Sequence, residues 1–275
     1  MCGKKQEPFN FITVSEKVRG FSHIKNKTKC QDRFKVEDLH DSKIIAVADG
    51  HGSSKCKYSH EGAKIATEVF CYTISKICKS YGEDINGLRL FLNSNRLEIL
   101  PKKIVQEWRR RVETNHYKKN RTEKFQYELY GTTLLGLLLV KDFYFAMQLG
   151  DGDILYVDRN ESVNYLIEAD RLLGTETYSI SSKNAWKYMR SEIHYIDDFK
   201  KYPLLFMVST DGYSNSYLSN DDFLKCGSDY YEMILNYGPE KIKNNLKEWL
   251  NEISHEGCGD DIALVIAYNQ SNSIK

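Results

Sequence analysis

The sequence predicts an α+β domain in which antiparallel strands form the core and helices pack outside them. Four short apolar runs between Gly131 and Ile167 are joined by turns, and such turns link antiparallel strands because a parallel crossover needs a dozen residues or more. Helical stretches stand before and after this block instead of alternating with its strands, which disfavours a doubly wound parallel sheet. No Pro-rich or Gly/Ser-rich linker divides the 275 residues, so we expect a single domain over residues 1–275.

The individual elements are predicted from the spacing of apolar residues, which is near two in strands and between three and four in helices. One helix is expected to begin near Ser53 or Ser54, either of which could cap it, and a second after Pro101. A third helical region covers residues 221–253. The four central runs are expected to pair as successive hairpins. The expected strands, in chain order, are Phe9–Ser15, Lys43–Ala48, Thr132–Val140, Phe143–Leu149, Ile154–Val157, Val163–Ile167, Pro203–Ser209 and Ile262–Tyr268.

The charge balance gives no support to a nucleic-acid partner. Lys and Arg total 39 against 38 Asp and Glu, a net charge of +1, so there is no bulk positive charge with which to bind a polyanion. Two basic stretches, residues 109–111 and 118–121, have glutamates close by and predict a solvated helical face. We therefore expect no binding to nucleic acid.

The sequence also predicts a cytoplasmic protein without a membrane partner. It contains no run of about 18 apolar residues, and the lysines near Met1 are not followed by the apolar core of a signal peptide. Cys2 instead of Gly follows Met1, so the myristoylation pattern is absent. The seven cysteines include no Cys-x-x-Cys pair, which predicts reduced thiols and no zinc site.

One pattern recurs along the chain: an Asp beside a Gly at the end of a buried strand. It occurs at Asp49-Gly50, Gly150-Asp151-Gly152, Asp211-Gly212 and Gly259-Asp260. Each pair alone is typical of a tight turn. Several carboxylates converging on one end of a sheet would repel one another, however, and bound divalent cations relieve that repulsion. Ligation by oxygen alone suits Mg²⁺ or Mn²⁺ better than zinc.

These motifs, in this order, resemble those of the metal-dependent protein phosphatases, the type 2C serine/threonine family, in a compact bacterial version. The resemblance implies a four-layer α-β-β-α sandwich with two antiparallel sheets between helical layers. It also implies phosphorylated proteins as substrates and a cognate serine/threonine kinase as a partner. The motifs that carry it are Gly20-Phe21-Ser22-His23, Cys30-Gln31-Asp32, Asp49-Gly50-His51-Gly52, Gly131-Thr132-Thr133, Gly150-Asp151-Gly152, Ser209-Thr210-Asp211-Gly212 and Gly259-Asp260-Asp261-Ile262.

The resemblance also implies a role for each matching residue around two or three Mg²⁺ or Mn²⁺ ions. Asp49 would bridge two cations, and Gly50 would offer its backbone carbonyl to one of them. The other metal ligands would be Asp32, Asp211, Asp260 and, for a weaker third cation shared with Asp211, Asp151. A water activated between two metal ions would attack phosphorus, and His51 would protonate the departing alkoxide. A loop histidine that only hydrogen-bonds the backbone is the alternative interpretation of His51.

Three departures from the family pattern leave a second function open. Lys27 stands where the family has a phosphate-binding Arg, and Arg33 or Lys29 could serve instead. Gln31 replaces a Glu, while Asp261 replaces an Asn, so the two changes could offset each other in charge. The alternative is therefore a catalytically weak or inactive phosphatase-fold module that binds phosphoproteins as a regulator. A metal-dependent nuclease or phosphodiesterase has only the carboxylates in its favour.

Substrate choice is expected to depend on loops around the cleft. The segment from Glu168 to Lys187 is a candidate lip of that cleft.

Overall fold

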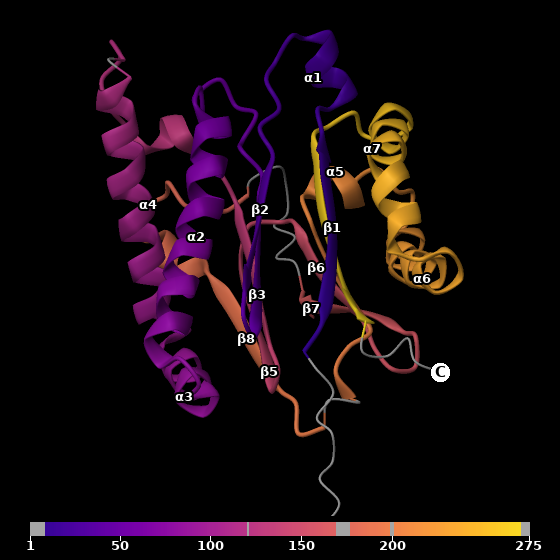
Figure 1. Ribbon diagram of the computed structural model, residues 1–275. Coiled ribbons are helices and arrows are strands. Elements are labelled where there is room, and N and C mark those ends of the chain that lie inside the picture. The colour runs from indigo at the N-terminus through magenta and orange to yellow at the C-terminus, as the bar shows by residue number, and fades with distance from the viewer. Residues whose placement is uncertain (1–8, 120, 169–176, 199–200, 271–275) are drawn as a thin grey trace, which may run out of the picture.

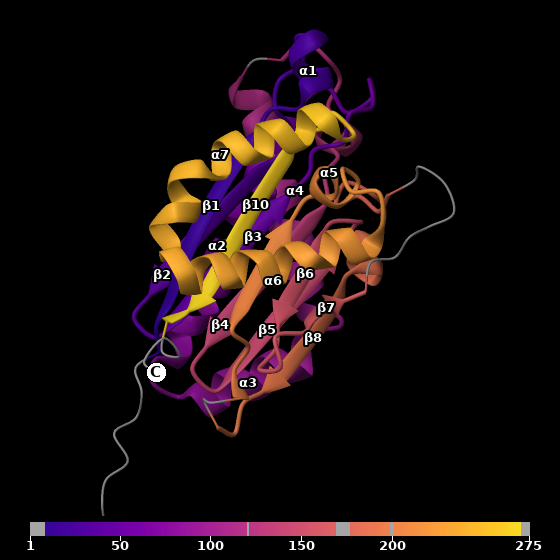
Figure 2. The same ribbon diagram turned by 90° about the vertical axis from the view of Figure 1, so that its right-hand side faces the viewer.

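The computed structural model describes residues 9–119, 121–168, 177–198 and 201–270. Two five-stranded sheets pack face to face, and helices cover the outer face of each (Figure 1). Helices α2, α3 and α4 lie outside one sheet, while α6 and α7 lie across the other (Figure 2). The predicted four-layer α-β-β-α sandwich is therefore confirmed.

Every strand pairing is antiparallel. The first sheet, in spatial order, consists of β1 (Phe11–Val18), β10 (Ile262–Asn269), β9 (Leu205–Ser209), β6 (Asp153–Val157) and β7 (Val163–Ile167). The second consists of β2 (Arg33–Leu39), β3 (Ser42–Ala48), β4 (Leu134–Val140), β5 (Phe143–Leu149) and β8 (Arg190–Tyr195).

Along the chain, the helices lie between strands. Pro239 occupies the first turn of α7, where its missing N–H costs nothing, and so divides the predicted helical region into two helices. The helices are α1 (Phe21–Lys25), α2 (Ser59–Tyr81), α3 (Ile85–Asn95), α4 (Ile99–Lys118), α5 (Asp211–Ser214), α6 (Asn220–Tyr237) and α7 (Pro239–Glu256). Among the described residues no helix is both long and apolar enough to cross a membrane.

The continuous apolar runs of the central strands follow from the layering. In β3, Ile44 and Ala46 face the helical layer, whereas Ile45 and Val47 face the opposite sheet. Every residue of β3 and of β4 is buried, because both faces of their sheet are covered. The paired sheets thus form a rigid block whose strand ends can carry a site.

The expectation of successive hairpins is wrong at one connection. Strands β4 and β5 pair as expected, and so do β6 and β7, but β5 and β6 lie in different sheets. The chain changes sheet at Gly150–Gly152, where a Cβ on Gly152 would lie 2.6 Å from the Ser209 carbonyl oxygen. The short connection therefore joins two layers at one end of the sandwich and places Asp151 there.

The sequence prediction of helix and strand boundaries also needs correction. Helix α2 begins at Ser59 after Tyr58, without a side-chain cap, so neither Ser53 nor Ser54 caps it. The prediction missed α1, α3, α5, β2 and β8. Most residues of β2 and β8, which are edge strands, are only partly buried, so their charged sequences lack the apolar pattern of the central strands.

Candidate metal centre and active site

Four carboxylates from four segments meet at one end of the paired sheets. Asp49 follows β3, Asp211 begins α5 after β9, and Asp260 precedes β10. The charges of Asp32 and Asp211 both lie close enough to Asp49 to raise its pKa. Asp260 is close enough to repel both Asp49 and Asp211. The structure thus brings together residues that are more than 200 positions apart.

Backbone contacts fix the position of Asp49. Its amide donates to Thr133 Oγ1 at 2.9 Å, and its carbonyl accepts from the Thr133 amide at 2.8 Å and from Thr132 Oγ1 at 2.6 Å. A Cβ on Gly50 would lie 2.7 Å from the Ser59 carbonyl carbon, so only glycine fits where the loop meets α2. Thr132 and Thr133 of the Gly131-Thr132-Thr133 motif therefore hold the backbone of Asp49 in place.

A second close approach brings Asp211 to Asp260. A Cβ on Gly212 would lie 2.0 Å from the Asp261 carbonyl oxygen, so the start of α5 and the segment before β10 touch through their backbones. Thr210, just before, donates through Oγ1 to Asp32 Oδ2 at 2.5 Å. The sequence analysis missed this role of Thr210, because the Ser-Thr-Asp-Gly motif does not indicate which distant residue Thr210 will contact.

The electrostatics of this cluster favour the neutral forms of its acids. Burial raises the pKa of Asp49 well above its usual value, and repulsion by Asp32, Asp211 and Asp260 adds to the shift. Burial, followed by repulsion from Asp261, likewise raises the pKa of Asp32. The pKa of Asp211 rises to about 7, through burial and then through Asp151 and Asp260. The largest contributions to the shifts of Asp49 and Asp211 come from burial and from other carboxylates, and none of them comes from a cationic side chain of the described residues.

This donor set fits a hard divalent cation. Its members are carboxylate oxygens that repel one another, and carboxylate oxygen is the ligand type that Mg²⁺ and Mn²⁺ prefer. Asp32 is 1% exposed, whereas the side chain of Asp260 is 51% exposed, so the cluster runs from the interior to the surface. A cation entering from the Asp260 side would remove the repulsion that raises these pKa values.

Asp151 lies beside this cluster, as its motif predicts. It is the largest source of repulsion on Asp211 after burial. Its carboxylate accepts a hydrogen bond from Thr177 Oγ1, which belongs to the predicted lip. Residues 169–176 of that lip lie outside the described residues. Asp153, which the sequence analysis did not single out, also repels Asp211 from the start of β6.

His51 has a ring nitrogen available for a ligand. Its backbone amide donates to the Gly131 carbonyl at 3.1 Å, which fixes the residue two positions beyond Asp49. Its Nε2 is buried and has no hydrogen-bond partner among the described residues. Burial lowers the pKa of His51, while the nearby carboxylate of Asp151 opposes that shift.

Asp261 connects three segments around the cluster. Its two carboxylate oxygens accept from the amides of Gly20 and Gln31, both at 2.6 Å, and Oδ1 lies 3.0 Å from His23 Nδ1. A nitrogen of His23 and one oxygen each of Asp260 and Asp261 lie within 4.8 Å of one another. Because both Asp261 oxygens already accept hydrogen bonds, we interpret Asp261 as the group that anchors the Gly20 and Gln31 loops.

The three cationic candidates for phosphate binding occupy different environments. Lys27 is exposed after α1 and has a φ of 56°, in the left-handed region. Arg33 donates through Nη1 to the carbonyls of Cys30 at 2.9 Å and Asp32 at 2.6 Å, which commits it to the loop backbone. Lys29 lines a surface pocket beside α2. The structure brings none of the three into contact with the carboxylates through a described ion pair.

The two basic stretches make more contacts with the rest of the protein than the sequence predicts. Arg110 and Arg111 pair with Glu107, as a solvated helical face would. Arg121, however, is only 14% exposed and pairs with Glu61 at 2.6 Å. The expectation of a solvated face is therefore wrong for Arg121.

The fold and this oxygen-rich centre define a metal-dependent hydrolase built on an α-β-β-α sandwich. A family model described as protein phosphatase 2C matches residues 19–251, and the chain belongs to that family. It is therefore a metal-dependent phosphoprotein phosphatase, which confirms the resemblance found in the sequence. A search of curated protein sequences gives no significant match.

Solved structures show the same fold at low sequence identity. A C. elegans sex-determining protein is 16% identical with a TM-score of 0.60, over 97% of this chain and 66% of that chain. The catalytic domain of the serine/threonine protein phosphatase PstP, solved with two manganese ions, is 14% identical with a TM-score of 0.56, over 94% and 97%. RsbX, solved with magnesium, is 16% identical with a TM-score of 0.52, over 94% of each chain.

Proposed function

We propose that this phosphatase hydrolyses phosphoserine and phosphothreonine in proteins, at the carboxylate cluster around Asp49. One observation carries the proposal: burial and repulsion by neighbouring carboxylates raise the pKa of Asp32, of Asp49 and of Asp211. An enzyme that uses divalent cations gains from such a cluster, because the repulsion that destabilises the metal-free chain becomes cation affinity.

The proposal assigns the metal ligands residue by residue. Asp49 would be shared between two cations, with the Gly50 carbonyl on one of them. Asp211 and Asp260 would complete the other position, and Asp32 would contribute directly or through water. Asp151 and Asp211 would hold a weaker third cation. The two manganese ions of PstP and the magnesium of RsbX support Mg²⁺ or Mn²⁺ as the cofactor.

When bound, the cations lower the pKa of water and neutralise phosphate charge. The chain's own residues would orient the substrate and move the proton. His51 would donate from Nε2 to the serine or threonine oxygen, a poor leaving group unless it is protonated. The negative charge of bound phosphate would add to that of Asp151 and favour the protonated imidazole.

Lys27 is the proposed contact to the phosphate that is removed. It stands at the position of the family's Arg, and as a point charge it would bind phosphate less rigidly than a guanidinium. Lys29 remains the alternative from the sequence. Arg33 is less suited, because its guanidinium already holds two backbone carbonyls.

Phosphorylated proteins are the substrates, and a serine/threonine kinase that phosphorylates them is the proposed partner. We also propose a cytoplasmic location. Buried thiols such as Cys71 and Cys78, which are free, support a reducing compartment.

The test is metal-dependent hydrolysis by the full chain. With Mn²⁺ or Mg²⁺ present, we expect turnover of p-nitrophenyl phosphate and of phosphothreonine peptides. EDTA should abolish this turnover, and excess Mn²⁺ should restore it. Activity that survives EDTA and dialysis would contradict the proposal. Bound metal without turnover on any phosphopeptide would favour the inactive regulator. No contact among the described residues favours that alternative.

A further inference from the structure

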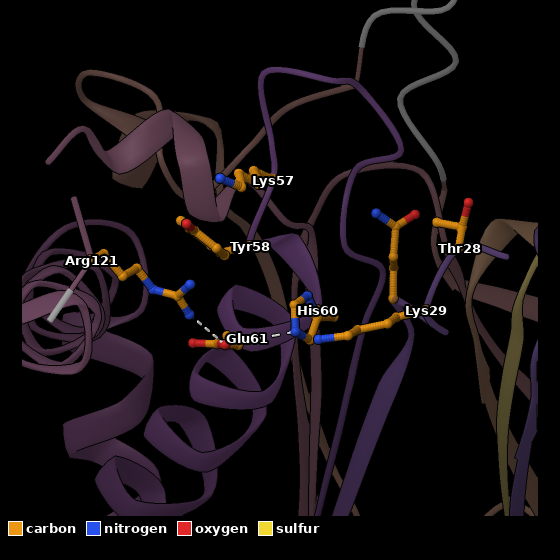
Figure 3. Close-up of a pocket in the computed structure, with 8 residues that line it drawn as sticks. Thr28, Lys29, Lys57, Tyr58, His60, Glu61 and Arg121 are labelled. Carbon is orange, nitrogen blue, oxygen red and sulfur yellow. Dashed lines mark hydrogen bonds and ion pairs between the residues drawn. The ribbon is translucent and has the colours of Figure 1, made fainter. Parts of the chain in front are cut away.

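A pocket of about 250 Å³ opens beside the carboxylate cluster, between the loop that precedes β2 and the start of α2 (Figure 3). The residues that matter in its lining are Lys29, Lys57, Tyr58, His60, Glu61 and Arg121. In Figure 3, Lys29 reaches toward His60 from one side, while Arg121 reaches Glu61 from the other. We call this site the basic pocket.

The basic pocket shares a wall with the proposed active site. Gln31 lines it and precedes Asp32 in the chain. The Gln31 carboxamide donates to the His51 carbonyl oxygen at 3.2 Å and to Ser59 Oγ at 2.7 Å. A peptide whose phosphorylated residue lies against His51 would therefore bring a neighbouring side chain to the basic pocket.

Among the described residues that line the pocket, Glu61 is the one acid, and its charge is already neutralised. Glu61 accepts from Lys119 Nζ at 2.8 Å and from Arg121 at 2.6 Å, and Asn115 also donates to it. Although burial raises its pKa, these hydrogen bonds lower it to about 2, so the carboxylate is ionised and fully paired. Glu61 thus holds Arg121 in place and leaves little negative charge facing the pocket.

The remaining charge around the basic pocket is positive. The charged residues that line the pocket and their ion-pair partners are considered together. Among those described there are two carboxylates, Glu61 and Glu123, and four cations, Lys29, Lys57, Lys119 and Arg121. Lys29 has no ion pair or hydrogen bond from its amine among the described residues. Its charge is close enough to His60 to help lower the pKa of that imidazole, after burial.

The wall behind these charges is preorganised. The Arg121 guanidinium lies 3.3 Å from the centre of the Tyr58 ring, and the Tyr58 hydroxyl donates to Glu123 at 2.6 Å. Tyr58 is buried, and Arg121 is 14% exposed, so this wall is fixed by packing. An anion entering the pocket would meet a fixed positive wall and one flexible amine, that of Lys29.

We propose that the basic pocket binds an anionic side chain, a carboxylate or a second phosphate, that flanks the phosphorylated residue of the protein substrate. This deepens the proposed function and rests on it for the nature of the peptide. The pocket makes the enzyme prefer phosphorylation sites in acidic or multiply phosphorylated segments. Lys29 and Lys57 at the rim would contact the anion, with Arg121 behind them.

The test measures binding, so that it does not depend on turnover. Fluorescent peptides carry a non-hydrolysable phosphonate in place of the scissile phosphate, and one Glu or one further phosphonate is placed at each position within about three residues of it. The reference peptide carries Ala at those positions. The variants are Lys29→Ala, Lys29→Glu and Lys57→Ala. Lys103→Glu, at an exposed residue of α4, is the control that changes net charge as much as Lys29→Glu.

We expect at least one register in which the anionic peptide binds wild-type protein about tenfold more tightly than the Ala peptide. Lys29→Ala should reduce this advantage severalfold and Lys29→Glu should abolish it, while Lys103→Glu keeps it. Lys57→Ala should reduce it to a smaller extent, because Lys57 already pairs with Glu123. Comparison of the Glu and phosphonate series identifies which anion the pocket prefers.

Three outcomes would overturn the inference. The wild-type protein could show no advantage in any register. Lys103→Glu could remove the advantage as fully as Lys29→Glu, which would indicate long-range charge alone. Lys29→Ala could weaken every peptide equally, which would make Lys29 a contact to the scissile phosphate. Turnover of p-nitrophenyl phosphate, measured in parallel, tests the proposed function separately, since that substrate carries no flanking residue.

Discussion

Two partly buried acidic sites lie close together at one end of this molecule and differ in what surrounds them. Asp49 is packed against other carboxylates, and its pKa lies well above the usual value through burial and then repulsion. Glu61 lies near the start of α2, whose Ser59 touches Gly50, and its pKa is about 2 because Lys119, Arg121 and Asn115 outweigh burial. Among the described residues no ion pair joins the first acid to a cationic side chain, whereas the second acid pairs with Lys119 and Arg121.

This difference separates a site built for a ligand from one built for stability. A buried carboxylate costs free energy unless a cation compensates it, and the chain supplies that cation at Glu61. At Asp49 the described residues supply no such cation, which is the arrangement expected of a metal centre. The four predictions below test this contrast, beginning with the largest expected effect.

Replacing Asp49 by Asn should abolish turnover and stabilise the metal-free chain. Loss of the shared ligand should lower kcat/KM by at least about a thousandfold, because several kcal/mol of cation binding are lost. Without metal, the variant should unfold about 2–4 °C above the wild type, because it removes a carboxyl whose ionisation burial and repulsion oppose. Activity assays and thermal unfolding in EDTA measure the two effects.

Asp229→Asn, at an exposed position of α6, is the matched control and should change neither quantity. An Asp49→Asn protein that is less stable than metal-free wild type would show that Asp49 is a structural acid like Glu61. The contrast between the two sites would then fail.

Replacing His51 by Gln should affect substrates according to their leaving group. Phosphoserine and phosphothreonine need a proton on the departing oxygen, so kcat should fall about 10²–10³-fold for peptides. The p-nitrophenolate ion leaves without a proton, so p-nitrophenyl phosphate should lose less than about tenfold. Equal losses on both substrates would indicate that His51 positions the site without donating a proton.

Much of this architecture is predictable because burial leaves a direct trace in the sequence. Strands covered on both faces, such as β4 and β5, are continuous apolar runs, and their predicted bounds agree closely with the structure. The Asp-Gly motifs mark the points where such strands end or, at Gly259-Asp260, begin. Since strand ends in a two-sheet sandwich meet at one edge, the motifs also predicted that Asp49, Asp211 and Asp260 lie together.

What the sequence could not predict depends on contacts between distant segments. Apolar periodicity reports how deeply a strand is buried and says nothing of which sheet it joins, so the change of sheet between β5 and β6 was missed. The bond from Thr210 to Asp32 and the pairing of Arg121 with Glu61 also join residues far apart in sequence. Because the sequence does not reveal Glu61 as the partner of Arg121, it predicts that Arg121 belongs to a solvated charged face.

Replacing Glu61 by Gln should destabilise the protein, in contrast to the effect at Asp49. The change leaves Arg121 and Lys119 without their shared carboxylate in a largely buried place, which costs about 1–3 kcal/mol. The melting temperature should fall by about 3–8 °C. Glu68→Gln, on the same helix with only a 3.9 Å pair to Lys64, is the control and should cost less than about 0.5 kcal/mol. Equal stability of the two variants would contradict the role assigned to Glu61.

The two sites should also give opposite slopes of stability against pH. Unfolded Asp211 releases its proton near pH 3.8, but the folded metal-free chain holds it until about pH 7. Between these values the folded state binds more protons, so its stability falls as pH rises. Glu61 is ionised down to about pH 2 in the folded protein and down to about pH 4.5 in the unfolded chain. Its contribution to stability is therefore lost as pH falls through that range.

Unfolding by urea at a series of pH values, with Asp211→Asn and Glu61→Gln compared to wild type, measures each slope. Saturating Mg²⁺ should flatten the slope that Asp211 causes, because the cation would bind there. It should leave the Glu61 slope unchanged, because Lys119 and Arg121 already pair with Glu61.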